Sequence, residues 1–169
     1  MDFYLSESDD HYAIFFNRSA RKISNAPYNG GIGTASIYVN RHVGIDFDRD
    51  PVEDTRNFLK NMGYSISDAV VTLTAVDTSE LVQKESSYDR FFIRTYCTVG
   101  TGNALSIGSY GQPHGTINIC VLTDIPLSDS AALGIFQTVV ESKSQAMNDL
   151  GIVDNATRKR APGTSTDTV

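Results

Sequence analysis

The chain has 169 residues, of which 40% are hydrophobic and 20% charged, and its formal net charge is −6. A chain of this length is most simply one domain, which buries about two thirds of its unfolded surface. The acidic balance argues against nucleic-acid binding, which needs a basic face, and no apolar run approaches the roughly 20 residues that span a bilayer.

The first predicted elements are two strands. Residues 11–17 predict one strand, which residues 20–24 extend or follow, and residues 34–43 predict the second. Between them lies a turn-rich loop that contains Gly30 and Gly31. Because glycine accepts positive φ and has no side chain, we expect this loop to allow a ligand close to the backbone.

A helix with well-marked ends follows. Asp50 is a cap, Pro51 takes the first helical position, Glu53 completes a capping box, and Gly63 ends the helix. Its apolar side consists of Val52, Thr55, Phe58, Leu59 and Met62.

The middle of the chain predicts two more strands. Residues 69–76 alternate strictly, and residues 91–99 form a second strand that ends in a tight turn at 100–103. The polar stretch 79–89 between them predicts a short helix or a connection.

The C-terminal third combines a buried strand, a long helix and a loop. The strand covers residues 116–122, and the helix runs from Ser128 to Leu150, where Gly151 stops it. One face of this helix is apolar at intervals of three or four residues: Ala132, Ile135, Phe136, Val139, Ala146, Met147 and Leu150.

Lys143 falls in the middle of that apolar face, whereas Glu141 projects to nearly the opposite side. A lysine in this position must extend to water, find a partner or lose its proton. The loop at residues 163–167 reads Gly-Thr-Ser-Thr-Asp and is rich in hydroxyls, backbone donors and one carboxylate. We expect this loop to return beside the helix, so that it and Lys143 line a common hollow.

The sequence lacks the residue patterns of a metal site and of a serine-nucleophile elbow. His11, His42 and His114 show no metal-ligand spacing, and we expect no metal and no cofactor. The segment Gly108-Ser109-Tyr110-Gly111 is one residue too short for the Gly-x-Ser-x-Gly motif of a nucleophile elbow. The two cysteines lie in separate predicted strands, and we expect them to be reduced thiols in the core of a cytoplasmic protein. They are Cys97 and Cys120.

The remaining polar residues suit attack on an amide, which requires a base, oxyanion donors and an acid for the leaving amine. Asp167 is a candidate base or orienting carboxylate, and Lys143 a candidate base, proton donor or oxyanion partner. Thr164 and Thr166 are candidate nucleophiles or hydrogen-bond donors. Glu141 is a candidate catalytic residue that the helix pattern directs toward solvent.

Neutral donors and glycines complete the candidate site. Asn103 and Asn118 offer side-chain amides of the oxyanion-binding type. The further substrate-binding candidates are Gly30, Gly31, Gly115, Thr116, Gly163 and Thr164.

Four motifs of this C-terminal third, in this order and spacing, resemble the adenosylcobinamide amidohydrolase family. They are Gly-Thr-Ile-Asn-Ile at 115–119, a Leu-Ser helix start, Glu-Ser-Lys at 141–143 and Gly-Thr-Ser-Thr-Asp at 163–167. The family usually has Ala where this chain has Ser142. The resemblance implies hydrolysis of adenosylcobinamide to adenosylcobyric acid and aminopropanol, a salvage step in cobalamin synthesis, by one amidohydrolase-like domain over residues 1–169.

Two alternatives remain at this point: a corrinoid-binding protein without activity, and an amidohydrolase that acts on another small amide. The hypothesis of an inactive corrinoid-binding protein and the hypothesis of an adenosylcobinamide amidohydrolase both predict a corrinoid small molecule as the partner, and neither predicts a nucleic-acid or membrane partner. A homo-oligomer remains open.

Strands outnumber helices and some adjoin without a crossover, which favours an α+β layered domain with a mixed or antiparallel sheet and two main helices. A strand-loop-strand-helix-strand order also occurs twice, over residues 11–78 and 90–169. Asn25-Ala26 corresponds to Asn103-Ala104. Duplication into two pseudo-symmetric halves explains this order, and chance among common turn residues is the alternative.

Overall fold

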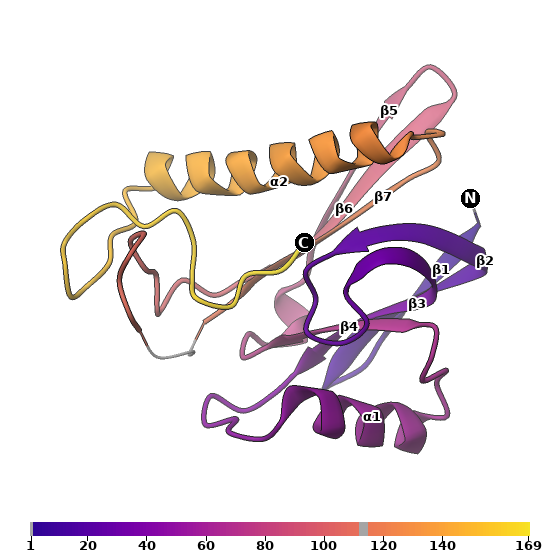
Figure 1. The fold of residues 1–169 in the computed structure, drawn as a ribbon, viewed down its shortest axis with the longest axis horizontal. Coiled ribbons are helices and arrows are strands. Elements are labelled where there is room, and N and C mark those ends of the chain that lie inside the picture. The colour runs from indigo at the N-terminus through magenta and orange to yellow at the C-terminus, as the bar shows by residue number, and fades with distance from the viewer. Residues whose placement is uncertain (1, 112–114) are drawn as a thin grey trace.

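The protein has a layered α+β fold with two separate sheets (Figure 1). The computed structural model describes residues 2–111 and 115–169, so His114 lies outside the described residues. The strands are β1 (Phe3–Glu7), β2 (His11–Ser24), β3 (Gly31–His42), β4 (Ala69–Thr74), β5 (Val82–Tyr88), β6 (Phe91–Val99) and β7 (Ile117–Thr123). The helices are α1 (Pro51–Met62), the short 3₁₀ helix η1 (Thr78–Glu80) and α2 (Asp129–Asp149).

The N-terminal sheet has the strand order β1-β2-β3-β4. Its first two pairings are antiparallel, and β4 then lies parallel to β3 after the chain has passed through α1. The C-terminal sheet, β5-β6-β7, is antiparallel throughout. The sheets are therefore mixed and antiparallel, as the sequence predicted for the fold class.

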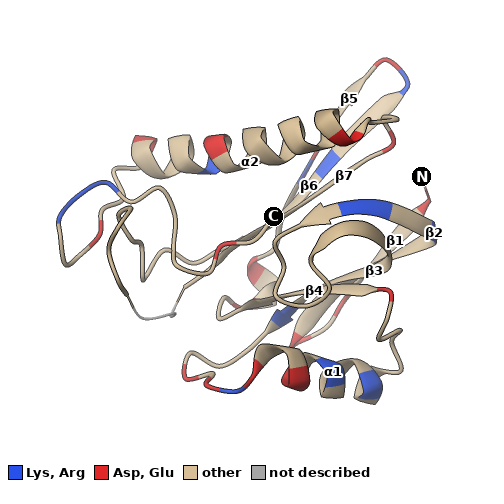
Figure 2. Ribbon diagram, in the orientation of Figure 1, with Lys and Arg blue, Asp and Glu red and all other residues tan. Residues whose placement is uncertain are grey.

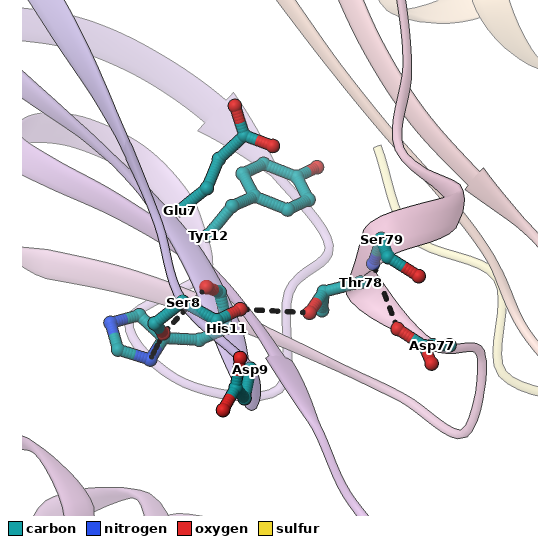
Figure 3. A pocket seen from close by; sticks show the side chains of 8 residues that line it. All are labelled: Glu7, Ser8, Asp9, His11, Tyr12, Asp77, Thr78 and Ser79. Atoms are coloured by element: carbon teal, nitrogen blue, oxygen red, sulfur yellow. Dashed lines mark hydrogen bonds between the residues drawn. The ribbon is translucent and has the colours of Figure 1, made fainter.

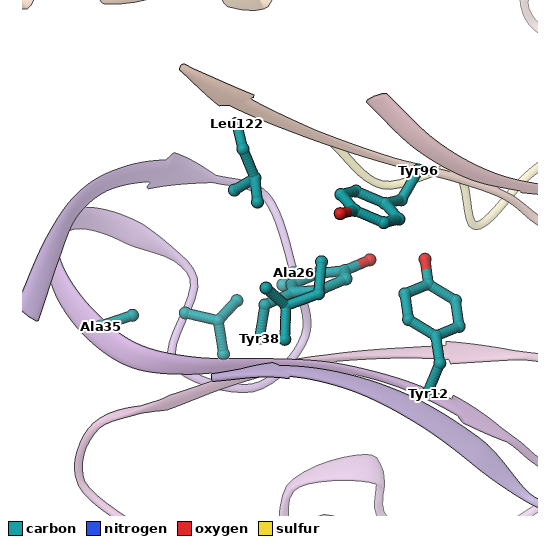
Figure 4. Packing of buried hydrophobic residues seen from close by; sticks show 8 residues of the cluster. Tyr12, Ala26, Ala35, Tyr38, Tyr96 and Leu122 are labelled. Atoms are coloured by element: carbon teal, nitrogen blue, oxygen red, sulfur yellow. The ribbon is translucent and has the colours of Figure 1, made fainter. Parts of the chain in front are cut away.

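Each face of the N-terminal sheet packs against a different layer. Along β2 and β3, alternate residues point to opposite faces: Ala13 and Val39 contact α1 through Leu59, whereas Tyr12 and Tyr38 face the second sheet. The core between the sheets consists of Tyr12, Ile14, Ala26, Ala35, Tyr38, Val70, Tyr96 and Leu122 (Figure 4).

The opposite face of the C-terminal sheet supports α2. Met147 of α2 packs there against Ile117, Ala104 and Ala161. The layers therefore follow the order α1, N-terminal sheet, C-terminal sheet, α2, with α1 and α2 on the two outer sides (Figure 1).

Both long helices begin where the sequence predicted. The side chain of Asp50 accepts from the backbone N–H groups of Val52 and Glu53, and Ser128 accepts from Ala131 N. Each helix is followed by a glycine with positive φ, +69° at Gly63 and +70° at Gly151. Such caps satisfy backbone groups that a helix end leaves without partners.

Two strands were missed by the sequence. Residues 3–7, which carry little signal, form β1, and the stretch 79–89, which predicted a short helix or a connection, contains the end of η1 and all of β5. Every residue of β5 is exposed, so no alternation marks it. Only its pairing with β6 makes it a strand.

The apolar face of α2 is partly buried at most of its predicted positions, but the last buried residue is Met147 and not Leu150. Met147 is buried, whereas Ala146 is exposed and Leu150 has 75% of its surface exposed. Leu150 is the C-cap residue, and a helix end that extends past its supporting sheet has no layer to cover it.

The two sheets are joined by a buried polar network. Asn118 on β7 donates to Oδ1 of Asn40 on β3 over 2.7 Å and to the carbonyl of Leu73 over 2.9 Å. Its own Oδ1 accepts from the hydroxyl of Thr168 at 2.7 Å, and Thr72 donates to Asn40 at 2.8 Å. The hydrogen-bonding groups of both amides thus have partners inside the core, as buried polar groups require.

The predicted duplication has a topological counterpart. In the first half a hairpin, β2–β3, is followed by a helix and a parallel partner, which places Thr72 beside Asn40. In the second half the hairpin β6–β7 is followed by α2 and a parallel bridge, which places Thr168 beside Asn118. We keep the duplication as a proposal, supported by this shared order.

Candidate active site

Lys143 and Asp167 form an ion pair between α2 and the C-terminal loop. Their side chains are only 14% and 10% exposed. Lys143 reaches this loop because it continues the half-buried face of α2, one turn before the buried Met147. The expected return of the loop beside the helix is therefore present in the structure.

The carboxylate of Asp167 has four donors around it. Oδ1 accepts from the backbone N–H of Ile117 at 2.9 Å and from the hydroxyl of Thr164 at 2.5 Å. Oδ2 accepts from the backbone N–H of Thr164 at 2.9 Å and from the ammonium of Lys143. A carboxylate offers about four acceptor sites, so all of them are used. Of the two roles predicted for Asp167, this saturation favours the orienting carboxylate over the base for water.

Gly163 provides the space in which this pair sits. A Cβ built on Gly163 would come closer than 3.0 Å to both Oδ2 of Asp167 and Nζ of Lys143, a separation that real Cβ atoms avoid. An ammonium has three N–H donors, and among the described residues only Asp167 accepts from Lys143. Two N–H donors therefore remain for a substrate oxygen or for water.

Hydroxyl groups surround the pair on the side of β7. The hydroxyl of Thr166 donates to the carbonyl of Gly115 over 3.1 Å. The hydroxyl of Thr164, whose single proton goes to Asp167, lies 3.0 Å from the same carbonyl oxygen. Thr116 and Thr166 share a hydrogen bond of 2.6 Å. Ser165 and Thr166 are exposed, whereas Gly115 and Thr116 are buried. Ser165 and Thr166 are therefore the most exposed residues of this loop, whereas Thr164 and Asp167 are partly exposed.

Asn103 joins the cluster from the turn that follows β6. Its Nδ2 donates to the hydroxyl of Ser165 over 3.4 Å. Its Oδ1 lies so close to Gly115 that a Cβ there would come within 3.0 Å of it. Two residues later, Leu105 pairs with Gly163 through a backbone hydrogen bond of 3.0 Å. The turn and the C-terminal loop thus run side by side.

Asn25 was not a predicted site residue, yet it ties the N-terminal half to this cluster. Its Nδ2 donates to the carbonyl of Asp167 over 3.0 Å, and its Oδ1 accepts from the backbone N–H of Val169 at 2.7 Å. The sequence offered one signal for it, the correspondence between Asn25-Ala26 and Asn103-Ala104.

Four predicted site residues lie elsewhere. Asn118 is 0% exposed within the network between the sheets, and Glu141 is exposed on α2, where it accepts from Gln137 at 2.7 Å. The carbonyl of Gly30 accepts from Lys22 over 2.9 Å, and the neighbouring Gly31 has a φ of +83°. The structure gives none of these four a contact with the Lys143–Asp167 pair, and their roles remain predictions.

The cysteines are free thiols on the C-terminal sheet. Burial, and to a lesser degree the charge of Asp167, raises the pKa of Cys97 to about 11, and burial raises the pKa of Cys120 to about 12. Since the thiolate is the nucleophilic form, neither thiol is activated at neutral pH.

Other possible sites in the described part of the chain lie away from this cluster. A hollow of about 460 Å³ is lined by Glu7, Ser8, Asp9, His11, Tyr12, Asp77, Thr78 and Ser79 (Figure 3). None of the predicted site residues lines it. Within residues 2–111 and 115–169, no group of three His, Cys, Asp or Glu side chains is arranged to hold a metal ion.

No helix within the described residues is long and apolar enough to cross a membrane. In a comparison with known protein families, the family described as adenosylcobinamide amidohydrolase matches residues 2–169. No curated protein and no solved structure matches the chain.

Proposed function

Because the chain belongs to the adenosylcobinamide amidohydrolase family, we propose that it catalyses the family's reaction at the Lys143–Asp167 pair. That reaction hydrolyses the aminopropanol amide of adenosylcobinamide and gives adenosylcobyric acid. The observation that carries the proposed location is a half-buried ammonium with two N–H donors left for a substrate, at the edge of a loop of exposed hydroxyls.

Lys143 stabilises the charge that develops on the amide oxygen. As the carbonyl carbon becomes tetrahedral, its oxygen gains negative charge, and a fixed cation at that point favours the transition state over the substrate. The same ammonium can supply the proton that the aminopropanol nitrogen needs when the C–N bond breaks, and the neutral amine that remains then takes up the proton that the attacking water brings to the carboxyl product, which restores the ammonium.

Asp167 holds Lys143 in place. Its remaining acceptor sites are filled by Thr164 and the backbone of Ile117, so the carboxylate cannot rotate without losing several hydrogen bonds. This support fixes the position of the ammonium before substrate binds, which is how electrostatic catalysis gains its effect.

Thr166 orients the attacking water. Its hydroxyl is held by Thr116 and by the carbonyl of Gly115, and the residue is exposed. Attack by this hydroxyl itself is the alternative, and a covalent acyl intermediate on Thr166 distinguishes the two.

The residues around the Lys143–Asp167 pair and Thr166 bind the substrate. Asn103 lies within reach of Ser165 and supplies an amide donor, while Gly163 and Gly115 leave room beside the ion pair. Thr116 and Thr164 complete the hydroxyl lining. Support for these roles comes from their contacts with Asp167, Lys143 or one another.

A corrinoid small molecule is the substrate, and we propose a cytoplasmic location and no nucleic-acid or membrane partner. The two free cysteines and the net charge of −6 support this. Lys and Arg are interspersed with Asp and Glu over the fold (Figure 2).

Incubation of the purified protein with adenosylcobinamide tests the function. We expect release of aminopropanol, measured by mass spectrometry, together with a corrinoid product that has gained one carboxylate and is retained on an anion exchanger. Binding of the corrinoid without any product at high protein concentration would contradict the proposed reaction.

A further inference from the structure

Two apolar side chains stand out from the surface close to the ion pair. Ile107 is 90% exposed and Tyr110 is 100% exposed, and two residues lie between them in the chain. Single exposed apolar residues are common and need no explanation. This pair is different because it belongs to the segment 105–111, whose first residue, Leu105, pairs with Gly163 beside Lys143.

The backbone of this segment forms a well-defined turn. The N–H of Ser109 donates to the carbonyl of Ser106 over 3.0 Å, and Gly108 has a φ of +84°. These features correspond to a type II turn with glycine at its third position. A Cβ on Gly111 would come within 3.0 Å of the Leu105 side chain, so the segment folds back on its own start.

The buried carboxylate of Asp154 holds the first residue of the turn, Ser106. Asp154 is 2% exposed and accepts from the backbone N–H of Ser106 at 3.2 Å and from its hydroxyl at 3.0 Å. Its other oxygen accepts from the backbone of Ala156 and Thr157. The turn therefore presents its apolar side chains from a rigid support, which reduces the entropy lost when a ligand binds them.

The distance from the turn to the ion pair suits a large substrate. Bridged residues of neighbouring strands have Cα atoms about 5 Å apart, and two further residues span at most about 7 Å. The Cα of Ile107 thus lies within about 12 Å of Gly163. A corrin macrocycle is broad and flat, so it extends beyond the one amide that is cleaved.

We propose that the 105–111 turn receives the flat face of the corrin ring, with Tyr110 and Ile107 packed against it, while the aminopropanol amide reaches Lys143. The identity of the ligand rests on the proposed function. An aromatic and a branched aliphatic side chain suit a conjugated ring, and covering them removes exposed apolar surface from water.

The test compares Tyr110→Ser and Ile107→Ser with the parent protein on adenosylcobinamide and on a small acetamide of aminopropanol. For the corrinoid we expect KM to rise about tenfold in each variant, the effect of losing roughly 60 Å² of apolar contact, with kcat nearly unchanged. For the small amide we expect no change in kcat/KM. The matched controls are Tyr88→Ser and Ile45→Ser, at residues that are 82% and 64% exposed elsewhere.

Equilibrium dialysis, read by the corrinoid's visible absorbance, gives the dissociation constant independently of turnover. A dissociation constant for Tyr110→Ser and Ile107→Ser within twofold of the Tyr88→Ser value would overturn the proposed contact. A parent protein that binds adenosylcobinamide without turnover would contradict the reaction alone, and weaker binding by the two turn variants would still support the contact. A parent that does not bind the corrinoid would overturn both.

Discussion

The ammonium of Lys143 occupies the space in which a side chain on Gly163 would begin, and this explains why the C-terminal loop needs glycine there. Any side chain at this position would enter the space that Lys143 and Asp167 occupy. The glycine, the lysine and the aspartate, which come from two separate motifs of the sequence, are therefore one structural unit.

Gly163→Ala tests that unit. We expect the extra methyl group to separate the ion pair, lower kcat by at least tenfold and reduce the free energy of unfolding by about 1–3 kcal/mol. Urea unfolding and product release measure the two effects. The control is Gly134→Ala within α2, where a Cβ meets no atom within 4 Å and alanine favours the helix. Full activity in Gly163→Ala would show that the close approach is unimportant.

Asn118→Ala distinguishes a structural role from substrate binding. The change removes the partner of Thr168 and the donor to Asn40 and Leu73, and buried groups without partners are costly. We expect a loss of about 3 kcal/mol in unfolding free energy, with KM unchanged for the folded fraction. A large rise in KM at nearly full stability would instead support the sequence prediction that Asn118 binds substrate.

The stability of the protein depends on pH through Asp154. Burial raises its pKa, but hydrogen bonds from Ser106, Ser109 and Thr157 outweigh this and hold the pKa well below the usual 3.8. A carboxyl with a lowered folded-state pKa contributes stability above its unfolded pKa of about 4 and loses it as the pH falls toward the folded value.

We therefore expect Asp154→Asn to be less stable than the parent at pH 7 and the gap to narrow between pH 4 and pH 3. Urea unfolding at fixed pH values measures this difference. A gap that stays constant over that range would mean that the charge of Asp154 does not stabilise the fold.

Thr166→Val removes the exposed hydroxyl with little change of shape. We expect kcat to fall about 10²-fold, as when a single positioned hydrogen-bonding group is lost from an active site. Thr138→Val, on the exposed face of α2, is the control and should keep the parent rate. Mass spectrometry of the parent during turnover completes the test, because an acyl adduct on Thr166 would identify it as the nucleophile and contradict an orienting role.

The sequence predicted the elements whose signals are local. Caps and glycine stops located α1 and α2, a β-branched run located β7, and the tight turn at 100–103 marked the end of β6. It also predicted that the Gly163–Asp167 loop would return beside Lys143, and of the three outcomes left open for that lysine the structure shows a partner, Asp167.

The remaining features depended on residues distant in the chain. β5 is fully exposed and is a strand only through its pairing with β6. The sequence makes Asn118 a candidate substrate-binding amide. Its hydrogen bond to Asn40, 78 residues earlier in the chain, is visible only in the structure. The four donors to Asp167 likewise include the backbone N–H of Ile117, 50 residues away, and so the sequence alone left both predicted roles of Asp167, base and orienting carboxylate, open.

The central claim is that the ammonium of Lys143 acts on the scissile amide, and the rate of aminopropanol release by Lys143→Met tests it most directly. The matched control is Lys60→Met, at an exposed lysine in the last turn of α1. Circular dichroism at the assay temperature shows whether each variant is folded. We predict that folded Lys143→Met loses at least 10³-fold in kcat, while Lys60→Met keeps the parent rate. A folded Lys143→Met that releases aminopropanol at the parent rate would contradict the account, because the ion pair would then only stabilise the fold.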